Sequence, residues 1–424
     1  MCLQIEEGEA MKAARMYPQA TVTPKGERAI VAGHPWVYEG EVETLEGADA
    51  IDNGCLVDVV SRKGSYLGTG LLSQRSKIRI RLITRNANDR CDAAFWERKI
   101  AWAWEYRKTV MGSDISSCRA LFSEADGFPG LIVDKFEDVL VAQVQSVGME
   151  RVKPQIFAGL ARVFAEDGMQ LRGIYERNDS AARTLEGLDR YCGWYAGEGV
   201  PAPEDPAETK AVICENGVRY NVDFADGQKT GFFLDQKYNR QAVARLAKGK
   251  RVLDCFTHTG SFALNAACAG AAHVTAVDIS QFAIDCAREN ARLNGVEDRM
   301  SFTCANVFDL LTELEQAKCR DYDFIILDPP AFTKNRKTVA SATRGYKDIN
   351  YRALKILPRG GYLATCSCSH FMNTERFKQM VASAARDAGV QLRQIEQRQQ
   401  APDHPILWGV PETDYLKFFL FQVV

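Results

Sequence analysis

The sequence predicts an α/β protein with three domains. A small β-rich domain and a middle α/β domain come first, and a C-terminal domain follows that is built on a doubly wound, mostly parallel sheet. The chain has 424 residues, which is too long for one core, since domains usually hold roughly 150 residues. After residue 210, short apolar runs alternate with helical patterns, as is typical of a parallel sheet covered by helices on both faces.

Apolar runs of strand length define the expected C-terminal sheet. They span Arg251–Cys255, Val274–Asp278, Met300–Cys304, Phe324–Asp328, Tyr362–Cys366 and Leu416–Val423. Between the second and third runs the spacing predicts a helix over Ser280–Asn294, with Ser280 as N-cap and Gly295 just beyond its end.

The domain boundaries follow from turn signals and from one exposed linker. Residues 1–15 are expected to be an N-terminal extension, 16–90 the β-rich domain, 91–200 the middle domain and 201–424 the C-terminal domain. The break lies in Glu198–Lys210, which holds three prolines and four acids and little to bury. In the middle domain we expect a helix from Asp92 to about Met111 and strands at Gly130–Phe136 and Val139–Gln145.

Composition excludes several classes of protein. Apolar residues are 46% and charged residues 25% of the chain, and the net charge is −2, so a disordered chain and a globally basic nucleic-acid binder are both disfavoured. No apolar run is long enough to span a membrane. The 13 cysteines and five histidines are dispersed, which predicts reduced thiols, no metal and a cytoplasmic location.

A cofactor site is expected where the first C-terminal strand ends. Asp254 closes that strand, and the following loop passes Phe256 and turns at Gly260 into a helix that begins with Ser261 and Phe262. Because the loop is not GxGxxG, it lacks the close backbone cradle that a pyrophosphate needs, which disfavours NAD. S-adenosylmethionine carries no phosphate, so a loop with a single glycine suffices for it.

Further cofactor contacts are expected at the ends of the next two strands. Asp278 is placed to accept hydrogen bonds from ribose hydroxyls, and Asn306 with Val307 is placed to meet the adenine. The alternative is structural, since Asp254 and Asp278 could instead bond loop amides and Asn306 could cap a helix.

The fourth and fifth strands carry the expected chemistry. Asp328 follows an apolar strand and precedes two prolines, which remove N–H donors and hold nearby carbonyls rigid. A carboxylate beside fixed carbonyls suits the edge of a flipped base such as cytosine. On the fifth strand, Cys366 or Cys368 could add as thiolate to C6 of a pyrimidine and make C5 nucleophilic, although buried strand cysteines are usually only core residues.

Two basic segments are candidates for binding RNA. In the first, Lys77, Arg79 and Arg81 alternate with apolar residues, so a strand would present the three cations on one face. The second lies between Thr333 and Arg352 and is expected to be a loop with interleaved tyrosines for stacking; its cations include Lys334, Arg336, Lys337 and Arg344. The alternative for each is a solvated surface.

These motifs resemble those of the class I bacterial large-subunit (23S) ribosomal RNA cytosine-C5 methyltransferases with an N-terminal PUA domain. The resemblance rests on His34–Trp36, Gly227–Gln236, the Asp254–Phe262 loop, Asp328–Phe332 and the cysteine strand. It implies an N-terminal PUA domain, a Rossmann-like methyltransferase domain, S-adenosylmethionine as cofactor, ribosomal RNA as partner and a homodimer. It also implies that Phe232 and Phe233 lie over the cofactor.

The resemblance implies that Cys368 is the nucleophile. Enzymes of this chemistry place it in a pattern resembling Gly-Gly-x-Leu-x-x-x-x-Cys-Ser, and counting from Gly360 reaches Cys368 rather than Cys366. Asp328 would hydrogen-bond the base near N3, and the acceptor of the C5 proton stays unassigned. Two alternatives stay open: methylation of a nucleobase nitrogen, and an RNA-binding assembly factor without turnover.

Overall fold

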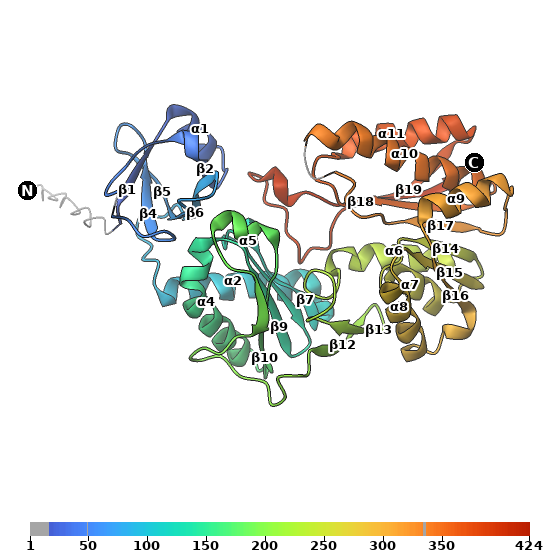
Figure 1. Ribbon diagram of the computed structural model, residues 1–424, viewed down its shortest axis with the longest axis horizontal. Coiled ribbons are helices and arrows are strands. Elements are labelled where there is room, and N and C mark those ends of the chain that lie inside the picture. The colour runs from blue at the N-terminus through green and yellow to red at the C-terminus, as the bar shows by residue number, and fades with distance from the viewer. Residues whose placement is uncertain (1–16, 49, 334–335) are drawn as a thin grey trace, which may run out of the picture.

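The computed structural model describes residues 17–424 except 49, 334 and 335. This part of the chain contains four β-sheets, of six, five, two and seven strands in chain order. The sheets follow one another along the long axis of the molecule, from the N-terminal domain to the C-terminal domain (Figure 1). The α/β class expected from the sequence, with a β-rich N-terminal domain, is confirmed.

The N-terminal sheet has the order β2-β6-β5-β4-β1-β3. Its strands are β1 (Gln19–Val22), β2 (Trp36–Tyr38), β3 (Val42–Leu45), β4 (Leu56–Val60), β5 (Tyr66–Leu72) and β6 (Ile78–Thr84), and its helix is α1 (Pro24–Val31). Alternate apolar residues of the strands, such as Ile80 and Leu82, form its core. The small size of this core explains why the domain also packs on its neighbour.

The middle sheet has the order β11-β10-β9-β8-β7. Its strands are β7 (Ser117–Phe122), β8 (Leu131–Phe136), β9 (Val139–Val144), β10 (Gly173–Asn178) and β11 (Tyr191–Trp194), and its helices are α2 (Ala93–Met111), α3 (Ser123–Asp126), α4 (Val147–Glu166) and α5 (Ala181–Glu186). The predicted N-cap of α2 is confirmed, because the Asp92 carboxylate accepts a hydrogen bond from the backbone N–H of Phe95 at 3.0 Å. Helices α2 and α4 contribute buried side chains to one core with this sheet.

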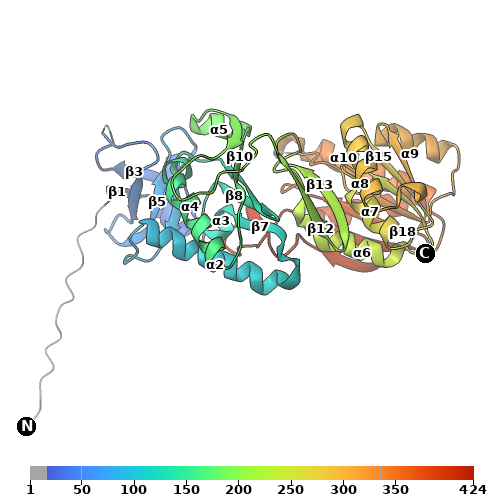
Figure 2. The same ribbon diagram turned by 90° about the horizontal axis from the view of Figure 1, so that it is seen from below.

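A hairpin joins the middle domain to the C-terminal domain. It consists of β12 (Lys210–Glu215) and β13 (Val218–Asp223), and it lies between the middle sheet and the C-terminal helices (Figure 2). The apolar pattern of the sequence did not predict it. The preceding segment 198–209 has no helix or strand and is largely exposed, as expected for the linker.

The C-terminal sheet has the order β16-β15-β14-β17-β18-β20-β19. Its strands are β14 (Arg251–Cys255), β15 (His273–Asp278), β16 (Met300–Cys304), β17 (Phe324–Leu327), β18 (Tyr362–Ser367), β19 (Leu392–Arg398) and β20 (Lys417–Val423). The first five are parallel and β20 runs antiparallel to β18. The predicted strands are therefore confirmed to within a residue or two, and β19 is an addition.

Helices cover both faces of this sheet. They are α6 (Lys237–Ala247), α7 (Ser261–Cys268) and α8 (Gln281–Leu293) on one face, and α9 (Val307–Gln316), α10 (Val339–Ile356) and α11 (Thr374–Ala388) on the other. Alternate strand residues serve alternate faces, so Val252 packs in one core and Leu253 in the other. Short 3-10 helices complete the set: η1 (Glu39–Glu41), η2 (Gly112–Ile115), η3 (Leu234–Gln236), η4 (Glu297–Arg299), η5 (Arg336–Thr338) and η6 (Pro411–Thr413).

A segment between β19 and β20, residues 399–416, connects the three domains, and we call it the interdomain loop. It leaves the C-terminal sheet and reaches toward the middle and N-terminal domains (Figure 1). The Tyr106 hydroxyl of α2 donates to the carbonyl of Pro402 at 3.0 Å, and the His34 ring of the N-terminal domain lies 3.8 Å from the Glu412 carboxylate.

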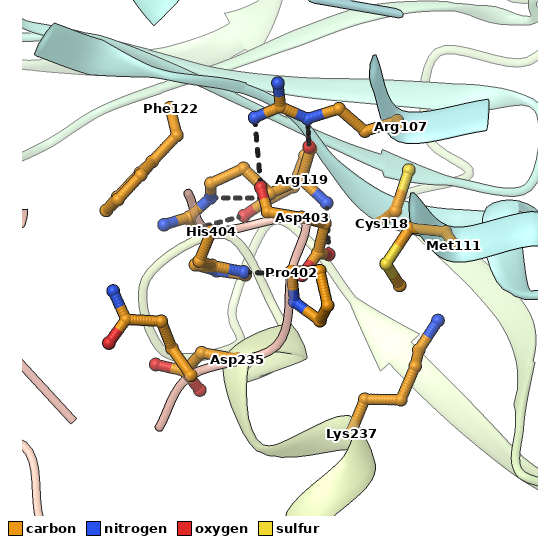
Figure 3. Close-up of polar contacts among 12 residues, drawn as sticks. Arg107, Met111, Cys118, Arg119, Phe122, Asp235, Lys237, Pro402, Asp403 and His404 are labelled. Carbon is orange, nitrogen blue, oxygen red and sulfur yellow. Dashed lines mark hydrogen bonds and ion pairs between the residues drawn. The ribbon is translucent and has the colours of Figure 1, made fainter. Parts of the chain in front are cut away.

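The interdomain loop is attached to the middle domain by a buried ionic cluster (Figure 3). Arg107 binds the Asp126 carboxylate through two hydrogen bonds of 2.7 Å and donates to the carbonyl of Asp403 at 3.0 Å. The Asp403 carboxylate binds the His404 ring at 2.8 Å and accepts from the backbone N–H of Arg119 at 2.9 Å. Burial would raise the pKa of Asp403, but His404 and the Arg119 N–H hold it below its ordinary value.

We expect Arg107→Met to lower the free energy of unfolding by about 3–5 kcal/mol, because it leaves the Asp126 carboxylate without its bidentate partner in a buried site. Urea denaturation followed by fluorescence measures this change. The matched control is Arg162→Met, which removes a largely exposed pair with Glu97 and should change stability by only about 0–1 kcal/mol. Equal destabilisation of the two variants would contradict the importance of the cluster.

Candidate active site

A cavity of about 260 Å³ opens beyond the carboxyl ends of β14, β15, β17 and β18. This is the edge at which doubly wound sheets bind ligands. The cavity is lined by Asp278, which ends β15, and by Cys368, which follows β18, and β14 and β17 lie between these two strands in the sheet. The predicted site residues that line it are Phe233, Phe256, Ser261, Phe262, Asp278, Asp328 and Cys368.

The loop after β14 is held in shape by Asp254. Its carboxylate is fully buried and accepts from the Thr257 hydroxyl at 2.6 Å and from the backbone N–H of Ala263 at 2.9 Å. Burial raises the pKa of Asp254 to about 7. The structure therefore places Asp254 behind the cavity wall, where it fixes the loop to the start of α7.

Left-handed backbone at three positions shapes the same loop. Phe256, His258 and Gly260 have φ of 64°, 53° and 83°. A Cβ on Gly260 would lie 3.0 Å from the Cβ of Ala287 on α8, so a larger residue would force the two helices apart. The turn therefore projects the Phe256 ring and the His258 ring into the cavity wall.

Asp278 stands at the end of β15 with an exposed apolar neighbour. Its two oxygens accept from the backbone N–H groups of His258 at 2.9 Å and Ser280 at 3.0 Å, so the structural role that the sequence left open is present. A carboxylate oxygen can accept a second hydrogen bond, and Asp278 still lines the cavity. Ile279 beside it is 72% exposed and offers an apolar surface to a flat ring.

Asp328 follows β17, the strand between β14 and β18, and lines the cavity. Its Oδ1 accepts from Gln236 Nε2 at 3.0 Å, and Pro329 and Pro330 continue the wall. Burial, reinforced by the neighbouring Asp235 carboxylate, raises the pKa of Asp328 to about 7. A carboxyl group that is partly protonated at neutral pH can donate a hydrogen bond to a base nitrogen.

The two cysteines of the fifth predicted strand differ in their access to the cavity. Cys366 lies within β18, is fully buried and belongs to the apolar core, and burial holds its pKa well above the ordinary value. Cys368 lies beyond the end of β18 and lines the cavity. Burial and then the Asp328 carboxylate raise the pKa of Cys368 to about 11. This difference in access to the cavity supports Cys368, the residue that the count from Gly360 indicated, as the candidate nucleophile.

The segment Gly227–Gln236 forms the side of the cavity that faces the middle domain. The Thr230 hydroxyl donates to the Asp134 carboxylate of β8 at 2.6 Å, and the Phe233 ring contacts the His258 ring with centroids 5.0 Å apart. The ammonium of Lys229 lies 4.6 Å from the centre of the Phe233 ring. The middle domain therefore helps to position this wall.

Several lining residues were not singled out from the sequence. They are Gln228, Lys229, Asp235, Gln236, Arg240, His258, Ile279 and Leu416. Most of them lie in Gly227–Gln236 or directly beside a predicted residue, so their neighbours in sequence were the available signal. Leu416 comes from the interdomain loop, and nothing in its local sequence indicated a place in the site.

Some predicted cofactor residues lie elsewhere. Phe232 is a correction: it is 3% exposed and packs against Tyr220 in the core, because neighbouring residues of an extended segment point to opposite sides. Val307 is likewise buried, in the core on the α9 face. The Asn306 side chain caps α9 by accepting from the Phe308 N–H at 3.0 Å.

The first basic segment is partly used for packing. Lys77 is exposed, but Arg79 pairs with Glu39. Arg81 pairs at 2.8 Å with Glu186 of α5, and both of these side chains are largely buried. The expectation that one strand face presents three free cations is therefore wrong for Arg81, since the N-terminal domain packs on the middle domain there.

The second basic segment is largely a helix, α10, and the expectation of a loop is wrong for that part. Arg336, Lys337 and Arg344 are exposed, and Lys334 lies outside the described residues. Tyr346 is a correction, because its ring is fully buried on the inner side of the helix and cannot stack on a base. Arg336 also lines a second cavity, of about 440 Å³, together with His370 and Arg376.

The described part of the chain offers neither a cluster of metal ligands nor a helix suited to a membrane. Within residues 17–424, leaving out 49, 334 and 335, no three His, Cys, Asp or Glu side chains gather as metal ligands would. In the same residues, every helix is too short or too polar to cross a membrane.

We expect Asp278→Ala to weaken binding of S-adenosylmethionine by roughly 2–3 kcal/mol, because it would remove the charge-assisted hydrogen bonds that the sequence predicts between Asp278 and the ribose. Isothermal titration calorimetry measures the affinity. Because Asp278 also holds two loop amides, the unfolding midpoint of the variant serves as a control for loop collapse. Unchanged affinity would remove Asp278 from the cofactor site.

Comparison with known families gives matches over most of the chain. The model of a family described as S-adenosylmethionine-dependent methyltransferase matches residues 170–422. A PUA-like domain model matches residues 20–85, which span the N-terminal sheet. Both matches agree with the folds described above.

Relatives and solved structures extend over nearly the whole chain. Two relatives named ribosomal RNA large subunit methyltransferase I, from Klebsiella pneumoniae (strain 342) and Escherichia coli O139:H28, are 38% and 37% identical and cover 96% and 95% of this chain and 99% of their own. A structure of a putative SAM-dependent methyltransferase from Streptococcus mutans has a TM-score of 0.79 at 23% identity, covering 96% of this chain and 100% of that one. A structure of a putative methyltransferase complexed with SAH gives the same values. These two structures show likeness of fold.

Proposed function

Because the chain belongs to the S-adenosylmethionine-dependent methyltransferases, we propose that it methylates C5 of a cytosine in large-subunit ribosomal RNA through Cys368. The substrate class follows from its relatives, which are named ribosomal RNA large subunit methyltransferase I. The observation that carries the proposal is the shared cavity of Asp278, Asp328 and Cys368, in which a cofactor end and a nucleophile end meet.

The residues of the cavity suit S-adenosylmethionine. Asp278 would hold the ribose hydroxyls, and Ile279 with Phe256 would border the base, because both line the cavity directly after the neighbouring strands β15 and β14. The cofactor supplies a methyl group on a sulfonium, which is an electrophile. The loop after β14 has no cluster of glycines, in keeping with a ligand that lacks phosphate.

Cys368 and Asp328 carry the proposed reaction. The Cys368 sulfur adds to C6 of the cytosine, which breaks the C5–C6 double bond and leaves an electron pair at C5 for the methyl group. Asp328, protonated in part near neutral pH, donates a hydrogen bond to N3 and so stabilises the negative charge that the addition sends into the ring. The C5 proton then passes to solvent water, the electrons of the C5–H bond restore the C5–C6 double bond, and the sulfur leaves C6 as a thiolate.

Partners and location form part of the same proposal. Exposed cations at Lys77, Arg336, Lys337 and Arg344 would contact RNA phosphates, and Lys334 belongs to the set by sequence. The homodimer and the cytoplasmic location implied at the sequence level also stay within the proposal. Methylation of a base nitrogen and an assembly role without turnover are the outcomes that would replace it.

Replacement of each of the two cysteines by alanine tests the mechanism. We expect Cys368→Ala to abolish methyl transfer to unmodified ribosomal RNA with cofactor affinity unchanged, because the nucleophile is removed. Cys366→Ala should retain far more activity than Cys368→Ala, since Cys366 lies in the core, and should lose packing energy and a hydrogen bond with Asp328. Transfer is measured with methyl-labelled cofactor, and mass spectrometry of the nucleosides identifies the product as 5-methylcytidine.

A substrate analogue gives the matching trap. With 5-fluorocytidine in the RNA, C5 carries fluorine in place of the proton, so elimination stalls and wild-type enzyme should stay covalently bound through Cys368. An adduct at Cys366 would reassign the nucleophile. Methylation of normal RNA without any adduct to the analogue would favour nitrogen methylation.

The exposed cations predict a salt-dependent interaction with RNA. We expect the double variant Arg336→Ala, Arg344→Ala to bind RNA more weakly. The plot of log affinity against log salt should also become less steep, by about 0.7 for each phosphate that these arginines neutralise. Filter binding over a series of salt concentrations measures the slope. The control Arg288→Ala, Arg292→Ala removes two cations on α8, on the other face of the sheet, and should leave the slope unchanged.

A further inference from the structure

A buried lysine lies beside the proposed nucleophile. Lys417 begins β20 and is 4% exposed. It is paired in register with Ser367, the residue before Cys368. Its ammonium donates to the carbonyl of Ser369, the residue after Cys368, at 2.7 Å, and to the carbonyl of Tyr415 at 2.7 Å.

Within the described residues no carboxylate lies within ion-pair distance of Lys417, whose ammonium donates only to carbonyls. Burial lowers the pKa of Lys417 to about 8, although Asp414 and Cys368 favour its ammonium form. Lys153 of α4 gives the contrast: it is also buried but pairs with Glu150 at 2.6 Å and Glu176 at 3.0 Å, and its pKa is raised above the ordinary value. Asp414 acts on Lys417 only from beyond ion-pair distance, so a thiolate at Cys368 would supply the close counter-charge that this lysine lacks.

The charges around Lys417 and Cys368 indicate that the Cys368 thiolate is the anion that would pair with Lys417. Cys368 faces Asp328 and Asp235, which oppose its ionisation, and Lys229 and Lys417, which favour it. Lys417 itself faces Cys368 and Asp414, both of which favour its ammonium form. Lys229 is exposed to solvent at the cavity mouth, so Lys417 is the cation of the two that is shielded from water, where a charge acts most strongly.

We propose that Lys417 is a positioning residue for catalysis, the buried counter-ion that stabilises the thiolate of Cys368. The inference deepens the proposed function and rests on Cys368 being the nucleophile. The Cys368 thiol releases its proton to solvent through the cavity, and the thiolate and the Lys417 ammonium then compensate each other until the bond between sulfur and C6 forms. When that bond breaks at the end of the reaction, the same ammonium receives the departing thiolate.

The pH dependence of Cys368 alkylation tests this role in the full-length protein without RNA or cofactor. The rate of modification by iodoacetamide is followed by mass spectrometry at the Cys368 side chain, with fragment ions separating it from Cys366. Below pH 8 we expect Lys417→Met to react about tenfold more slowly than wild type, because an opposite charge nearby shifts a thiol pKa by roughly one unit or more.

The difference must vanish at high pH if the charge of Lys417 causes it. Its ammonium is present below its pKa of about 8 and disappears as the pH rises through that value. The rates of wild type and Lys417→Met should therefore converge above about pH 8 to 9, and log rate against pH for wild type should flatten there. Lys417→Arg stays charged, so its plot should be straight and lie on the wild-type line at low pH.

A matched control separates charge near Cys368 from loss of any buried lysine. Lys237 is 1% exposed and also donates to two carbonyls, those of Asp114 and Ser117, each at 2.8 Å. Lys237→Met should leave the alkylation profile of Cys368 on the wild-type line. A merely structural role of Lys417 would instead give Lys417→Met a difference that is the same at every pH.

Two results would overturn the proposal: a wild-type plot that is straight through pH 8, or Lys417→Met rates equal to wild type at pH 7. Comparing Lys417→Arg with wild type gives the same decision if the methionine variant does not fold. The 5-fluorocytidine trap with wild-type enzyme reports separately on the proposed function. If the alkylation rates follow the expected pH dependence but wild-type enzyme forms no covalent adduct with the 5-fluorocytidine RNA, the ion pair between Lys417 and Cys368 is supported and the covalent mechanism is rejected.

Discussion

The buried ion pair between Arg119 and Asp134 is the contact on which the active-site wall depends. Its two hydrogen bonds, of 2.8 and 2.9 Å, lie inside the middle domain. Asp134 also accepts from Thr230 of the cavity wall, and the Arg119 N–H donates to Asp403 of the interdomain loop. Charges buried at such a junction are tolerated only when each has partners in fixed positions. The pair therefore sets how the middle domain, the cavity wall and the interdomain loop meet.

Charge is distributed unevenly among the acids around the cavity. Burial raises the pKa of Asp254 and of Asp328 to about 7, and for Asp328 the Asp235 carboxylate adds to burial while Arg240 acts against it. Asp235, which lies near His404 and Lys229, has its pKa held below the ordinary value in spite of burial. Near pH 7 the cavity thus holds a partly protonated acid, Asp328, beside Asp235, whose pKa is lowered. That arrangement suits a reaction in which one group donates a hydrogen bond to the base and negative charge is kept away from the ring.

The sequence predicted the parts of the structure that depend on local pattern. The strands that carry Asp254 and Asp278 near their carboxyl ends and the N-caps Asp92 and Ser280 follow from apolar periodicity and capping residues. Periodicity did not show that Cys368 lies beyond the end of β18. Hydrophobic burial on both faces of a parallel sheet makes such strands easy to identify.

What the sequence did not predict depends on contacts between distant segments. The side chains of β19 are mostly exposed, so its apolar pattern is too weak to indicate a strand. Arg81 looks like a free cation until Glu186, more than a hundred residues away, is seen beside it. In the sequence Tyr346 and Phe232 look available for stacking, but the backbone directs both rings inward, where each packs in a hydrophobic core. Tertiary packing decides such cases, because local sequence does not record which face a neighbour covers.

The interdomain loop makes the cavity a property of the whole molecule rather than of one domain. Its residue Glu412 lies beside His34 of the N-terminal domain, and four residues later Leu416 lines the cavity. Gln400 and Thr413 cross-link the two sides of the loop, since the Gln400 amide donates to the Thr413 carbonyl, so the loop behaves as one packed unit. A displacement of the N-terminal domain would therefore have to be absorbed within a few residues of Leu416 and Lys417. If the N-terminal domain holds RNA, as proposed, this linkage would make the position of the bound RNA and the geometry around Cys368 interdependent.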